Sequence, residues 1–527
     1  MLIPHILTQN ARLYPDETAL VERMPEINSR RSITWAEFDR MANQVARTLI
    51  DLGVKKGDKV VQLMTNCLEW LPIYFGILRT GALVVPLNFR FDADKILLCT
   101  ETSEARVFIF GEEFIERMES VKAGLDRHVG RYIFTGPDSP APFGAMTLDE
   151  VFTCQADTVP DPGLSSDDDA ALYFTSGTTG VPKAVLLTHR CLEFACEVEQ
   201  AHHGQTRDDN FLCIPPLYHT GAKMHWFGNF LVGAKSVILK GVTPRWILEA
   251  ASEEKVSIVW LLVPWAHDIL IALENGDVNL EDYDLSSWRL MHIGAQPVPP
   301  SLIEKWKAVF PDQDYDTNYG LTEATGPGCV HLGLGNEHKV GAIGLPGYGW
   351  ECRVVDGDLA PLPGGETGEL LVRGPGMMKE YYKNPEETAR TLVNGWLRTG
   401  DMARQDESGF IWLVDRKKDL IISGGENIFP VEIENHFMTH DHIQDVAVIG
   451  LPDVRLGEVV AVIVQVKQGR TLTEKDIQDF SLTLPRYKRP RKIIFDDVPR
   501  NPTGKIEKPV LRRRYIGETR DVSRLFI

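Results

Sequence analysis

The chain has 527 residues, of which 43% are apolar and 25% are charged, and its formal net charge is -18. This composition is ordinary for a globular protein and excludes disordered and fibrous classes, while the length allows two or three domains. The acidic balance argues against nucleic acid as a partner, because such binding neutralises many phosphates with lysine and arginine. Any polyanionic ligand must therefore be held by local donors.

The cysteines and the apolar stretches bear on the cellular compartment of the protein. The eight cysteines include no C-x-x-C pair, and the first twenty residues lack a basic segment followed by an apolar stretch. We therefore expect a reducing, cytoplasmic location. The longest apolar stretch, residues 256–273, is interrupted by Pro264, His267 and Asp268, so it predicts a buried strand followed by a helix and no transmembrane segment.

Strand-like and helix-like stretches alternate through the first 350 residues or so. A helix is expected from residue 34 to about Gly53, because Thr34 and Glu37 stand at the spacing of a capping box. The alternation predicts an α/β fold with a largely parallel sheet. Strands are expected at 58–64, 81–88, 257–263 and 288–294.

The pattern of apolar runs and turn residues changes in the last third of the chain. From about Glu351, short apolar runs separated by Gly/Pro turns predict a small β unit. Beyond the basic segment 415–419, about a hundred residues carry their own helix and strand patterns, which is the size of a small domain. We predict a large multi-sheet N-terminal domain at 1–417 and a small, mobile α+β C-terminal domain at 418–527.

The segment YFTSGTTGVPKAVLLTHR, residues 173–190, suggests an anion site. Small residues let backbone N–H groups approach a phosphate, and hydroxyls with Lys183 add further donors. It is not a loop of the GxxxxGK[ST] kind, because Pro182 has no N–H and Ala184 cannot bind magnesium. Taken alone, the segment fits a flexible surface loop equally well.

Six further segments follow in order: PLYHTGA (216–222), HIGAQP (292–297), YGLTEA (319–324), GWLRTGD (395–401), VDRKKDLIISGGENIFPVEIE (414–434) and PRNPTGK (499–505). With the first loop, they resemble the adenylate-forming superfamily, which includes acyl-CoA synthetases, adenylation domains of peptide synthetases and firefly-type luciferases. Seven matches in order are far more specific than any one. The resemblance implies an AMP-forming carboxylic acid:CoA ligase, which forms acyl-AMP and pyrophosphate and then transfers the acyl group to the thiol.

The resemblance also implies the ATP-binding residues. Tyr319 would stack on adenine, and Asp401, an acceptor-only side chain, would hold the ribose hydroxyls. Glu323 would bind Mg²⁺, a hard cation that prefers carboxylate and phosphate oxygens. Taken singly, these would be ordinary loop and turn residues. The implied nucleotide-binding set is Thr175, Ser176, Gly177, Thr178, Thr179, Gly180, Lys183, Gly294, Ala295, Gln296, Tyr319, Gly320, Asp401 and Arg416.

The C-terminal part would supply a different residue to each half-reaction. The resemblance implies that Lys505 meets the carboxylate and the α-phosphate and that the Thr322 hydroxyl lies near a phosphate. The implied catalytic set is Lys505, Thr322 and Glu323. The tunnel for the pantetheine arm of CoA would be lined by Gly424, Gly425 and Glu426, where a missing Cβ leaves room. Lys418 falls at the hinge position, since one small domain must present two faces in turn.

The acyl pocket is the least defined part. His219, Trp226 and Gly320 are expected there, and Trp226 with neighbouring aromatics would enclose a compact ring or short chain, although core packing of these rings is an open alternative. Lys223 and His225 are unusual neighbours for an apolar pocket. They could pair with a polar group of the substrate, but we expect them to point to solvent.

Two alternatives to a CoA ligase remain. A stand-alone enzyme that loads a carrier protein is disfavoured because the segment 223–230 has no aspartate to hold an amino acid and no carrier domain follows, but aryl-acid enzymes share this feature. A non-catalytic nucleotide-binding regulator is disfavoured by intact Lys183, Glu323, Asp401 and Lys505. We expect ATP, Mg²⁺, CoA and a small aromatic, alicyclic or short-to-medium-chain acid as ligands, and a homodimer is possible.

Overall fold

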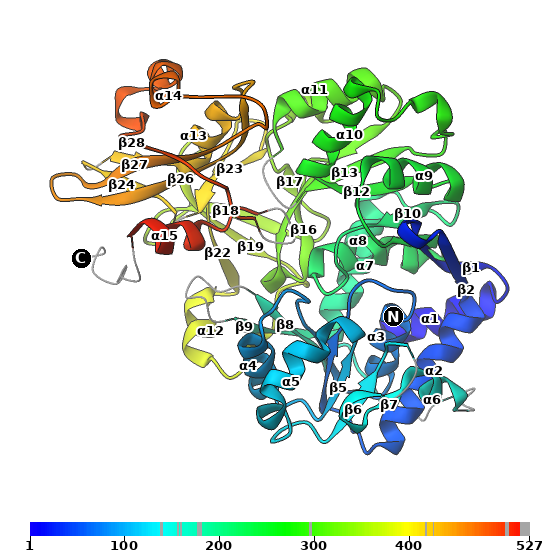
Figure 1. Cartoon of the computed structure of the whole chain (residues 1–527). Helices are drawn as coiled ribbons and strands as arrows, with labels where there is room; N and C mark the ends of the chain where they lie inside the picture. The colour runs from blue at the N-terminus through cyan, green and yellow to red at the C-terminus, as the bar shows by residue number, and fades with distance from the viewer. Residues whose placement is uncertain are drawn as a thin grey trace. The chain divides into compact units, whose positions relative to one another are not determined.

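The structure is a computed structural model that describes residues 1–137, 141–154, 158, 161–175, 182–294, 298–416, 419–424, 426–500 and 505–516 (Figure 1). The chain divides into two compact units. Unit 1 comprises Met1–Gly294, Pro300–Cys352 and Val372–Arg398, and unit 2 comprises Ala295–Pro299, Arg353–Leu371 and Thr399–Ile527. Unit 2 thus includes short segments that precede residue 417, and the domain boundary at 417/418 stays a prediction.

An eight-stranded sheet in unit 1 carries the first predicted loop. Its strands are parallel except for β8 with β9 and β9 with β20, which are antiparallel. The order is β20 (Glu380–Tyr381), β9 (Lys183–Thr188), β8 (Asp169–Thr175), β4 (Leu83–Pro86), β3 (Lys59–Leu63), β5 (Val107–Phe110), β6 (Arg131–Phe134) and β7 (Met146–Thr147).

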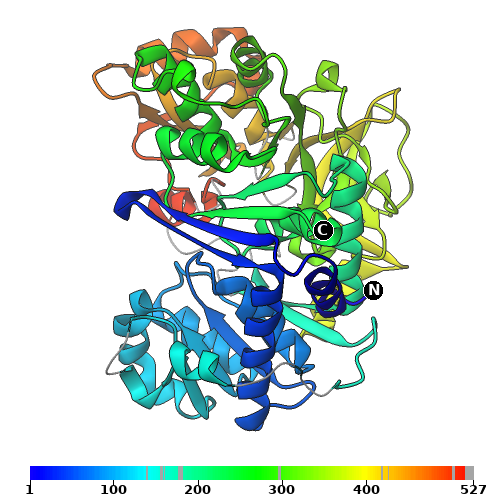
Figure 2. The ribbon, with the colours of Figure 1, turned by 90° about the vertical axis from the view of Figure 1, so that its right-hand side faces the viewer.

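A seven-stranded sheet in the same unit is parallel except for the hairpin of β1 with β2. Figure 2 shows this blue hairpin beside the green strands, which come much later in the sequence. The order is β14 (Asp314–Asp316), β13 (Leu290–Gly294), β12 (Ile258–Leu262), β10 (Asn210–Cys213), β11 (Lys235–Leu239), β1 (Thr18–Met24) and β2 (Ser29–Thr34). A small antiparallel sheet consists of β15 (Asn318–Leu321), β16 (Gly326–His331) and β17 (Leu345–Pro346).

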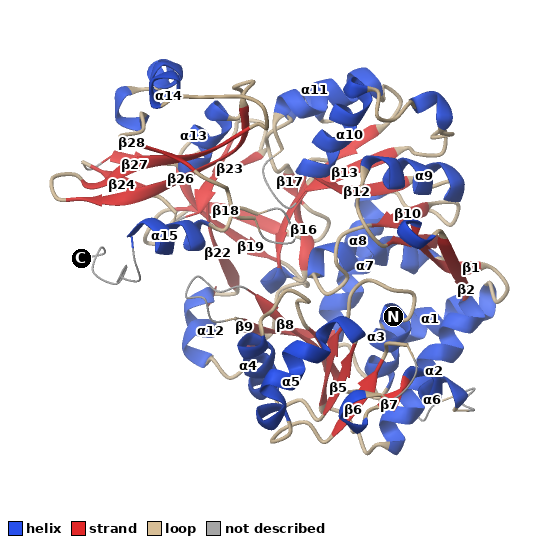
Figure 3. Cartoon of the chain, viewed as in Figure 1, coloured by secondary structure: helices blue, strands red, loops and turns tan. Residues whose placement is uncertain are grey.

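Helices cover the sheets of unit 1 (Figure 3). As predicted, α2 begins after Thr34, whose hydroxyl accepts from the Glu37 N–H while the Glu37 carboxylate accepts from the Thr34 N–H. These two hydrogen bonds satisfy two of the N–H groups that have no hydrogen-bond partner within the helix at its start. The helices of this unit are α1 (Ile3–Leu13), α2 (Trp35–Asp51), α3 (Trp70–Arg79), α4 (Ala93–Ser103), α5 (Ile115–Leu125), α6 (Leu148–Thr153), α7 (His189–His203), α8 (Thr220–Val232), α9 (Pro244–Glu254), α10 (Val263–Asn275), α11 (Pro300–Val309) and α12 (Pro385–Thr391).

The predicted β unit after Glu351 forms a further sheet. Its strands are β18 (Glu351–Val355), β19 (Thr367–Arg373), β22 (Trp396–Gln405) and β21 (Leu392–Val393), and β23 (Ile411–Arg416) pairs with β22. The last sheet lies wholly in unit 2 and consists of β25 (Glu426–Ile428), β24 (Ile421–Ser423), β27 (Gly457–Val466) and β26 (Ile443–Asp453), with β28 (Lys492–Phe495) beside β27. The helices that follow β25 are α13 (Pro430–Phe437), α14 (Glu474–Phe480) and α15 (Lys508–Ile516).

The sheet of unit 2 has its own apolar core. Ile433 and Phe437 of α13 and Ile477 of α14 are fully buried with the strand residues Val448 and Val462. A chain segment that buries its own apolar faces is a domain in the structural sense. The predicted fold, an α/β class with a multi-sheet N-terminal part and a small C-terminal domain, is confirmed. None of the helices in the described residues is long and apolar enough to cross a membrane.

Candidate active site

The first predicted loop joins two antiparallel strands. Thr175, the last residue of β8, is the register partner of Lys183, the first residue of β9. Because the strands are hydrogen-bonded neighbours, both ends of the loop are fixed within one sheet. The loop residues Ser176, Gly177, Thr178, Thr179 and Gly180 lie outside the described residues.

Lys183 faces two residues that the sequence did not single out. Its Nζ pairs with Glu387 Oε1 and lies 5.0 Å from the centre of the Tyr381 ring. Tyr381 is brought there because β20 pairs with β9, with Tyr381 opposite Val185. The ammonium group therefore lies between a carboxylate and an aromatic face, both of which favour a cation.

Tyr381 also links the lysine to Glu323. The Tyr381 hydroxyl donates to Glu323 Oε1 at 2.7 Å, and the Met378 N–H donates to the Glu323 carbonyl oxygen at 2.7 Å. Burial and the neighbouring Glu323 raise the pKa of Tyr381, so Tyr381 is a donor at neutral pH. One cation and one carboxylate, predicted to serve phosphate and magnesium, are thus held together by a single tyrosine.

The turn that carries Glu323 also contacts the start of α8. Thr322 begins the 3-10 turn Thr322–Ala324, and its Oγ1 lies 3.4 Å from Thr220 Oγ1. The preceding residue, His219, is the N-cap of α8, where its Nδ1 accepts from the Gly221 N–H at 3.1 Å. The predicted phosphate contact and the predicted acyl-pocket histidine therefore belong to touching segments.

Three more of the predicted residues lie on strands of unit 1. Tyr319 and Gly320 are in β15, and the Tyr319 side chain is largely buried. Gly294 is the last residue of β13, and a Cβ placed on it would lie 3.6 Å from Trp260 Nε1. Ala295 and Gln296 lie outside the described residues. The end of a parallel strand is a usual position for a ligand-binding loop in such sheets.

Trp226 lies in an aromatic cluster. Its side chain is 1% exposed, and its ring centre lies 6.1 Å from that of Phe75 and 5.0 Å from that of Phe230. Packing within the core is therefore a sufficient reason for an aromatic residue at this position. Contact of Trp226 with an acyl group stays a prediction.

The expectation that Lys223 and His225 point to solvent is wrong. Lys223 is 0% and His225 is 1% exposed. The Lys223 ammonium lies 4.2 Å from the ring centre of Tyr74 and 4.3 Å from that of Tyr173. Burial lowers the pKa of Lys223 well below its usual range. Both residues lie on α8, which is enclosed by other elements of unit 1, and the local sequence did not reveal that enclosure.

Asp401 and Arg416 form a pair within unit 2. They are register partners on β22 and β23, and Arg416 Nε lies 2.8 Å from Asp401 Oδ1. The Asp401 side chain is 5% exposed, whereas that of Arg416 is 46% exposed. The structure thus places Asp401, the predicted ribose acceptor, next to Arg416, which the resemblance implies as a ribose or phosphate contact.

Other predicted residues of unit 2 lie on separate segments. Gly424 has a φ of 61°, which favours glycine, and its N–H donates to the Leu456 carbonyl at 2.8 Å. Glu426 begins β25 opposite Ser423. Lys505 is exposed and lies shortly before α15. Gly425 and Lys418 lie outside the described residues.

A buried charge network anchors α15, and the sequence did not indicate it. Lys508 Nζ lies 2.9 Å from Glu434 Oε1 on α13, and both side chains are at most 10% exposed. Burial alone would lower the pKa of Lys508, but Glu434 and Asp415 raise it. Burial raises the pKa of Asp415 to about 6. The helix that follows Lys505 is therefore fixed by ionic contacts inside unit 2.

Comparisons with known proteins agree with this arrangement. The family model for AMP-binding enzymes matches residues 7–382, and the model for their C-terminal domain matches residues 432–505. A long-chain-fatty-acid–CoA ligase of Mycobacterium tuberculosis is 31% identical over 97% of this chain and 98% of its own. A feruloyl-CoA synthase of Amycolatopsis is 32% identical over 96% and 98%.

Among solved structures, an anthranilate CoA ligase in complex with anthranoyl-AMP superposes with a TM-score of 0.88 at 26% identity, covering 98% of this chain and 97% of its own. The resemblance to adenylate-forming enzymes is therefore confirmed over almost the whole chain. The chain belongs to the AMP-binding enzyme family, and within it to the AMP-forming acid:CoA ligases.

Proposed function

We propose that this enzyme activates a small carboxylic acid with ATP and transfers the acyl group to CoA. In the first step, a carboxylate oxygen bonds to the α-phosphorus and the bond to pyrophosphate breaks. In the second step, the CoA sulfur bonds to the acyl carbon, AMP leaves and the thiol proton passes to solvent. The observation that carries the proposal is the contact chain Lys183–Tyr381–Glu323, which supports a triphosphate and its cation beside the β8–β9 loop.

The chain's own residues suit these steps by charge and position. Two anions must meet at phosphorus, so positive potential and orientation matter more than a proton shuttle. Lys183 would exchange its partner Glu387 for the β- and γ-phosphates, which carry more negative charge. Tyr381 orients Glu323 through one carboxylate oxygen. The other oxygen would hold Mg²⁺, which neutralises phosphate charge.

Unit 2 would provide the ribose contact and the residues of the two half-reactions. Asp401, held by Arg416, would accept the ribose hydroxyls. Lys505 would serve acyl-adenylate formation, and the segment with Gly424 and Glu426 would line the path of pantetheine. We propose that the domain 418–527 turns about Lys418 between these two roles, as expected for a site that must be rebuilt between steps.

We propose that the acid is compact: aromatic, alicyclic or of short to medium chain length. Two of the proteins compared above are named for feruloyl and anthranoyl groups, which are aromatic, while a third is named for long-chain fatty acids. Loading of a carrier protein is not favoured, because the relatives are CoA ligases.

A pyrophosphate-release assay tests the proposed function. The full chain is incubated with ATP, Mg²⁺ and a panel of aromatic, alicyclic, short, medium and long acids, with and without CoA. We expect pyrophosphate with one or more compact acids and acyl-CoA only when CoA is present. Activity with long-chain acids alone would contradict the compact substrate, and acyl transfer to a carrier protein but not to CoA would contradict the thiol acceptor.

Replacing the ribose carboxylate should weaken nucleotide binding. In Asp401→Ala the ribose hydroxyls lose a charged acceptor, so ATP affinity should fall by about 1.5–3 kcal/mol, or roughly 10- to 150-fold. Isothermal titration calorimetry with ATP measures this. Asp497→Ala removes an exposed aspartate of the same unit and should bind ATP normally. Equal ATP affinity in the Asp401 variant and the wild type would reject the ribose role.

A further inference from the structure

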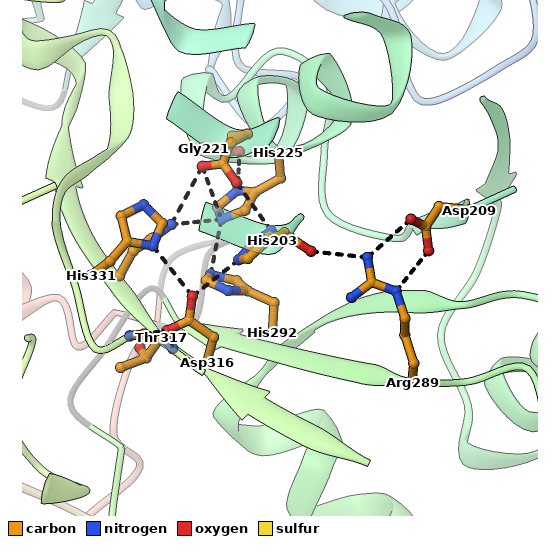
Figure 4. Close-up of polar contacts among 12 residues, drawn as sticks. His203, Asp209, Gly221, His225, Arg289, His292, Asp316, Thr317 and His331 are labelled. Carbon is orange, nitrogen blue, oxygen red and sulfur yellow. Dashed lines mark hydrogen bonds and ion pairs between the residues drawn. The ribbon is translucent and has the colours of Figure 1, made fainter. Parts of the chain in front are cut away.

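A buried cluster of imidazoles and carboxylates lies inside unit 1 (Figure 4). Its members come from helices α7 and α8 and strands β13, β14 and β16, which are distant in sequence. Every side chain in it is at most 2% exposed. The cluster consists of Glu199, His203, His225, His292, Asp316 and His331.

The centre of the cluster is the Asp316 carboxylate. Its Oδ2 lies 3.1 Å from His203 Nε2 and 3.3 Å from His331 Nδ1. Its Oδ1 accepts from the N–H groups of Thr317 and Gly333 at 2.8 and 2.9 Å. Two backbone donors therefore fix the carboxylate, and its second oxygen is directed at histidine nitrogens.

The hydrogen bonds of His225 determine which nitrogen of His292 is available. His225 Nδ1 lies 2.6 Å from the Gly221 carbonyl oxygen, which can only accept, so Nδ1 carries the proton. In the neutral ring, the one lone pair of His225 Nε2 is then shared by two donors, His292 Nε2 at 2.9 Å and Asn318 Nδ2 at 3.0 Å. His292 Nδ1 is left with a lone pair, and it has no hydrogen-bond partner among the described residues.

His203 has a comparable arrangement. Its Nδ1 lies 3.3 Å from Glu199 Oε2, and its Nε2 is directed at Asp316. A carboxylate behind one nitrogen and an oxygen ligand beside the other is the usual environment of a metal-binding histidine. His292 differs in detail: its Nε2 is held by His225 and its Nδ1 has no hydrogen-bond partner among the described residues, whereas His203 Nδ1 is within ion-pair distance of Glu199 but makes no hydrogen bond there.

The charge of the cluster also favours a cation. Glu199 and Asp316 are both fully buried carboxylates, and two negative charges in the interior are strongly unfavourable without compensation. In the part of the chain that the structure describes, neither carboxylate pairs with lysine or arginine. Arg289, the nearby guanidinium, is paired with Asp209 at 2.8 Å. A divalent ion would neutralise both charges.

We propose that His203, His292 and Asp316 bind a divalent transition-metal ion, with zinc as the best match, in a structural site. One ligand atom of each lies within 4.8 Å of the others, whereas tetrahedral zinc with bonds of about 2.0–2.1 Å places its ligands about 3.4 Å apart. The ligand atoms that are farthest apart would have to approach one another by up to about 1.4 Å. His331 is outside this group of three, but its Nδ1 lies 3.3 Å from the same Asp316 oxygen, so it would become the fourth protein ligand of a closed structural site only after a further approach to the ion.

The ion would stabilise the segments that carry predicted active-site residues. His292 stands two residues before Gly294, and Asp316 stands three residues before Tyr319. Asn318, directly before Tyr319, donates to His225 Nε2 at 3.0 Å. Metal binding would therefore fix the bases of both segments from inside the protein. It takes no part in the reaction itself and is separate from the proposed magnesium contact of Glu323.

Metal analysis of the wild-type protein is the primary test. The tag-free full chain is desalted and analysed by mass spectrometry for bound metals, and we expect about one zinc per chain. Removal by a chelator should lower the melting temperature by a few °C, and Zn²⁺ but not Mg²⁺ should restore it. Co²⁺ should give the visible absorption bands of a tetrahedral site. Less than about 0.1 equivalent of any transition metal, with no effect of Zn²⁺ or Co²⁺, would overturn the proposal in favour of a protonated hydrogen-bond network.

Variants assign the bound metal to this cluster. His292→Ala and Asp316→Asn should lose the metal, and Glu199→Gln should weaken its affinity by about 10- to 100-fold as a residue behind a ligand does. His189→Ala removes an equally buried histidine of α7 outside the cluster and should retain about one equivalent. Full retention in a folded His292 or Asp316 variant would place the metal elsewhere. If those variants do not fold, the wild-type titration decides the question.

Discussion

Replacing Lys505 with alanine should slow acyl-adenylate formation by on the order of 10²–10³-fold, as expected for the loss of one preorganised donor where charge gathers on the α-phosphate. Thioester formation from supplied acyl-AMP and CoA should remain nearly intact, because that step would not use this lysine. Single-turnover measurements of each half-reaction give the two rates separately. Lys505 is exposed in this structure, so its removal should not disturb the core.

The matched control is Lys492→Ala, which removes an exposed lysine of β28 in the same unit. Both of its half-reactions should run at the wild-type rate. An equal loss of both half-reactions in the Lys505 variant would show that the lysine does not act in one step alone. In that case the two-face mechanism would be abandoned, while the nucleotide contacts of unit 1 would be unaffected.

Replacing Lys508 with methionine should destabilise unit 2 by roughly 3–5 kcal/mol, because breaking a buried ion pair leaves an uncompensated charge. Glu434 would lose the ammonium that lies 2.9 Å from its Oε1, and Asp415 would lose a positive charge that favours its ionised form. Urea denaturation gives the free energy of unfolding. Hydrogen exchange in β26 and β27 locates the loss in unit 2.

A pair with an exposed carboxylate provides the comparison for this variant. Lys488, itself 13% exposed, pairs with Glu432, which is 51% exposed; because Glu432 stays hydrated without its partner, Lys488→Met should cost no more than about 1 kcal/mol. Combining Lys508→Met with Glu434→Gln should recover part of the loss, since the unpaired charge disappears. Equal stability of the Lys508 and Lys488 variants would mean that the network does not anchor α15.

Local signals were sufficient for much of the fold. The capping box of Thr34 and Glu37 predicted the start of α2, and the apolar runs predicted β3, β4, β12 and β13. The strand and helix read from residues 256–273 are β12 and α10. Such features are set by neighbours within a few residues, which is why the sequence reveals them.

Long-range pairing was not accessible in this way. Lys183 was identified from its own loop, but nothing near it indicated Glu387 or Tyr381, which follow about 200 residues later and depend on the pairing of β20 with β9. Likewise, the sequence around Lys223 did not indicate that this side chain is buried. Only the packing of Tyr74 and Tyr173 around it in the structure shows this. Side chains contributed by separate elements become neighbours only in the folded chain.

The late arrival of β20 has a consequence for synthesis on the ribosome. Until Tyr381 has emerged, β9 is the edge of its sheet, and its sequence KAVLLT is apolar. At about 5–20 residues per second, the roughly 200 residues between β9 and β20 take about 10–40 s to translate. An uncovered apolar edge pairs readily with other chains. We therefore expect a period during synthesis in which this strand is open to chaperones and to aggregation, until β20 pairs with Val185 and Leu186.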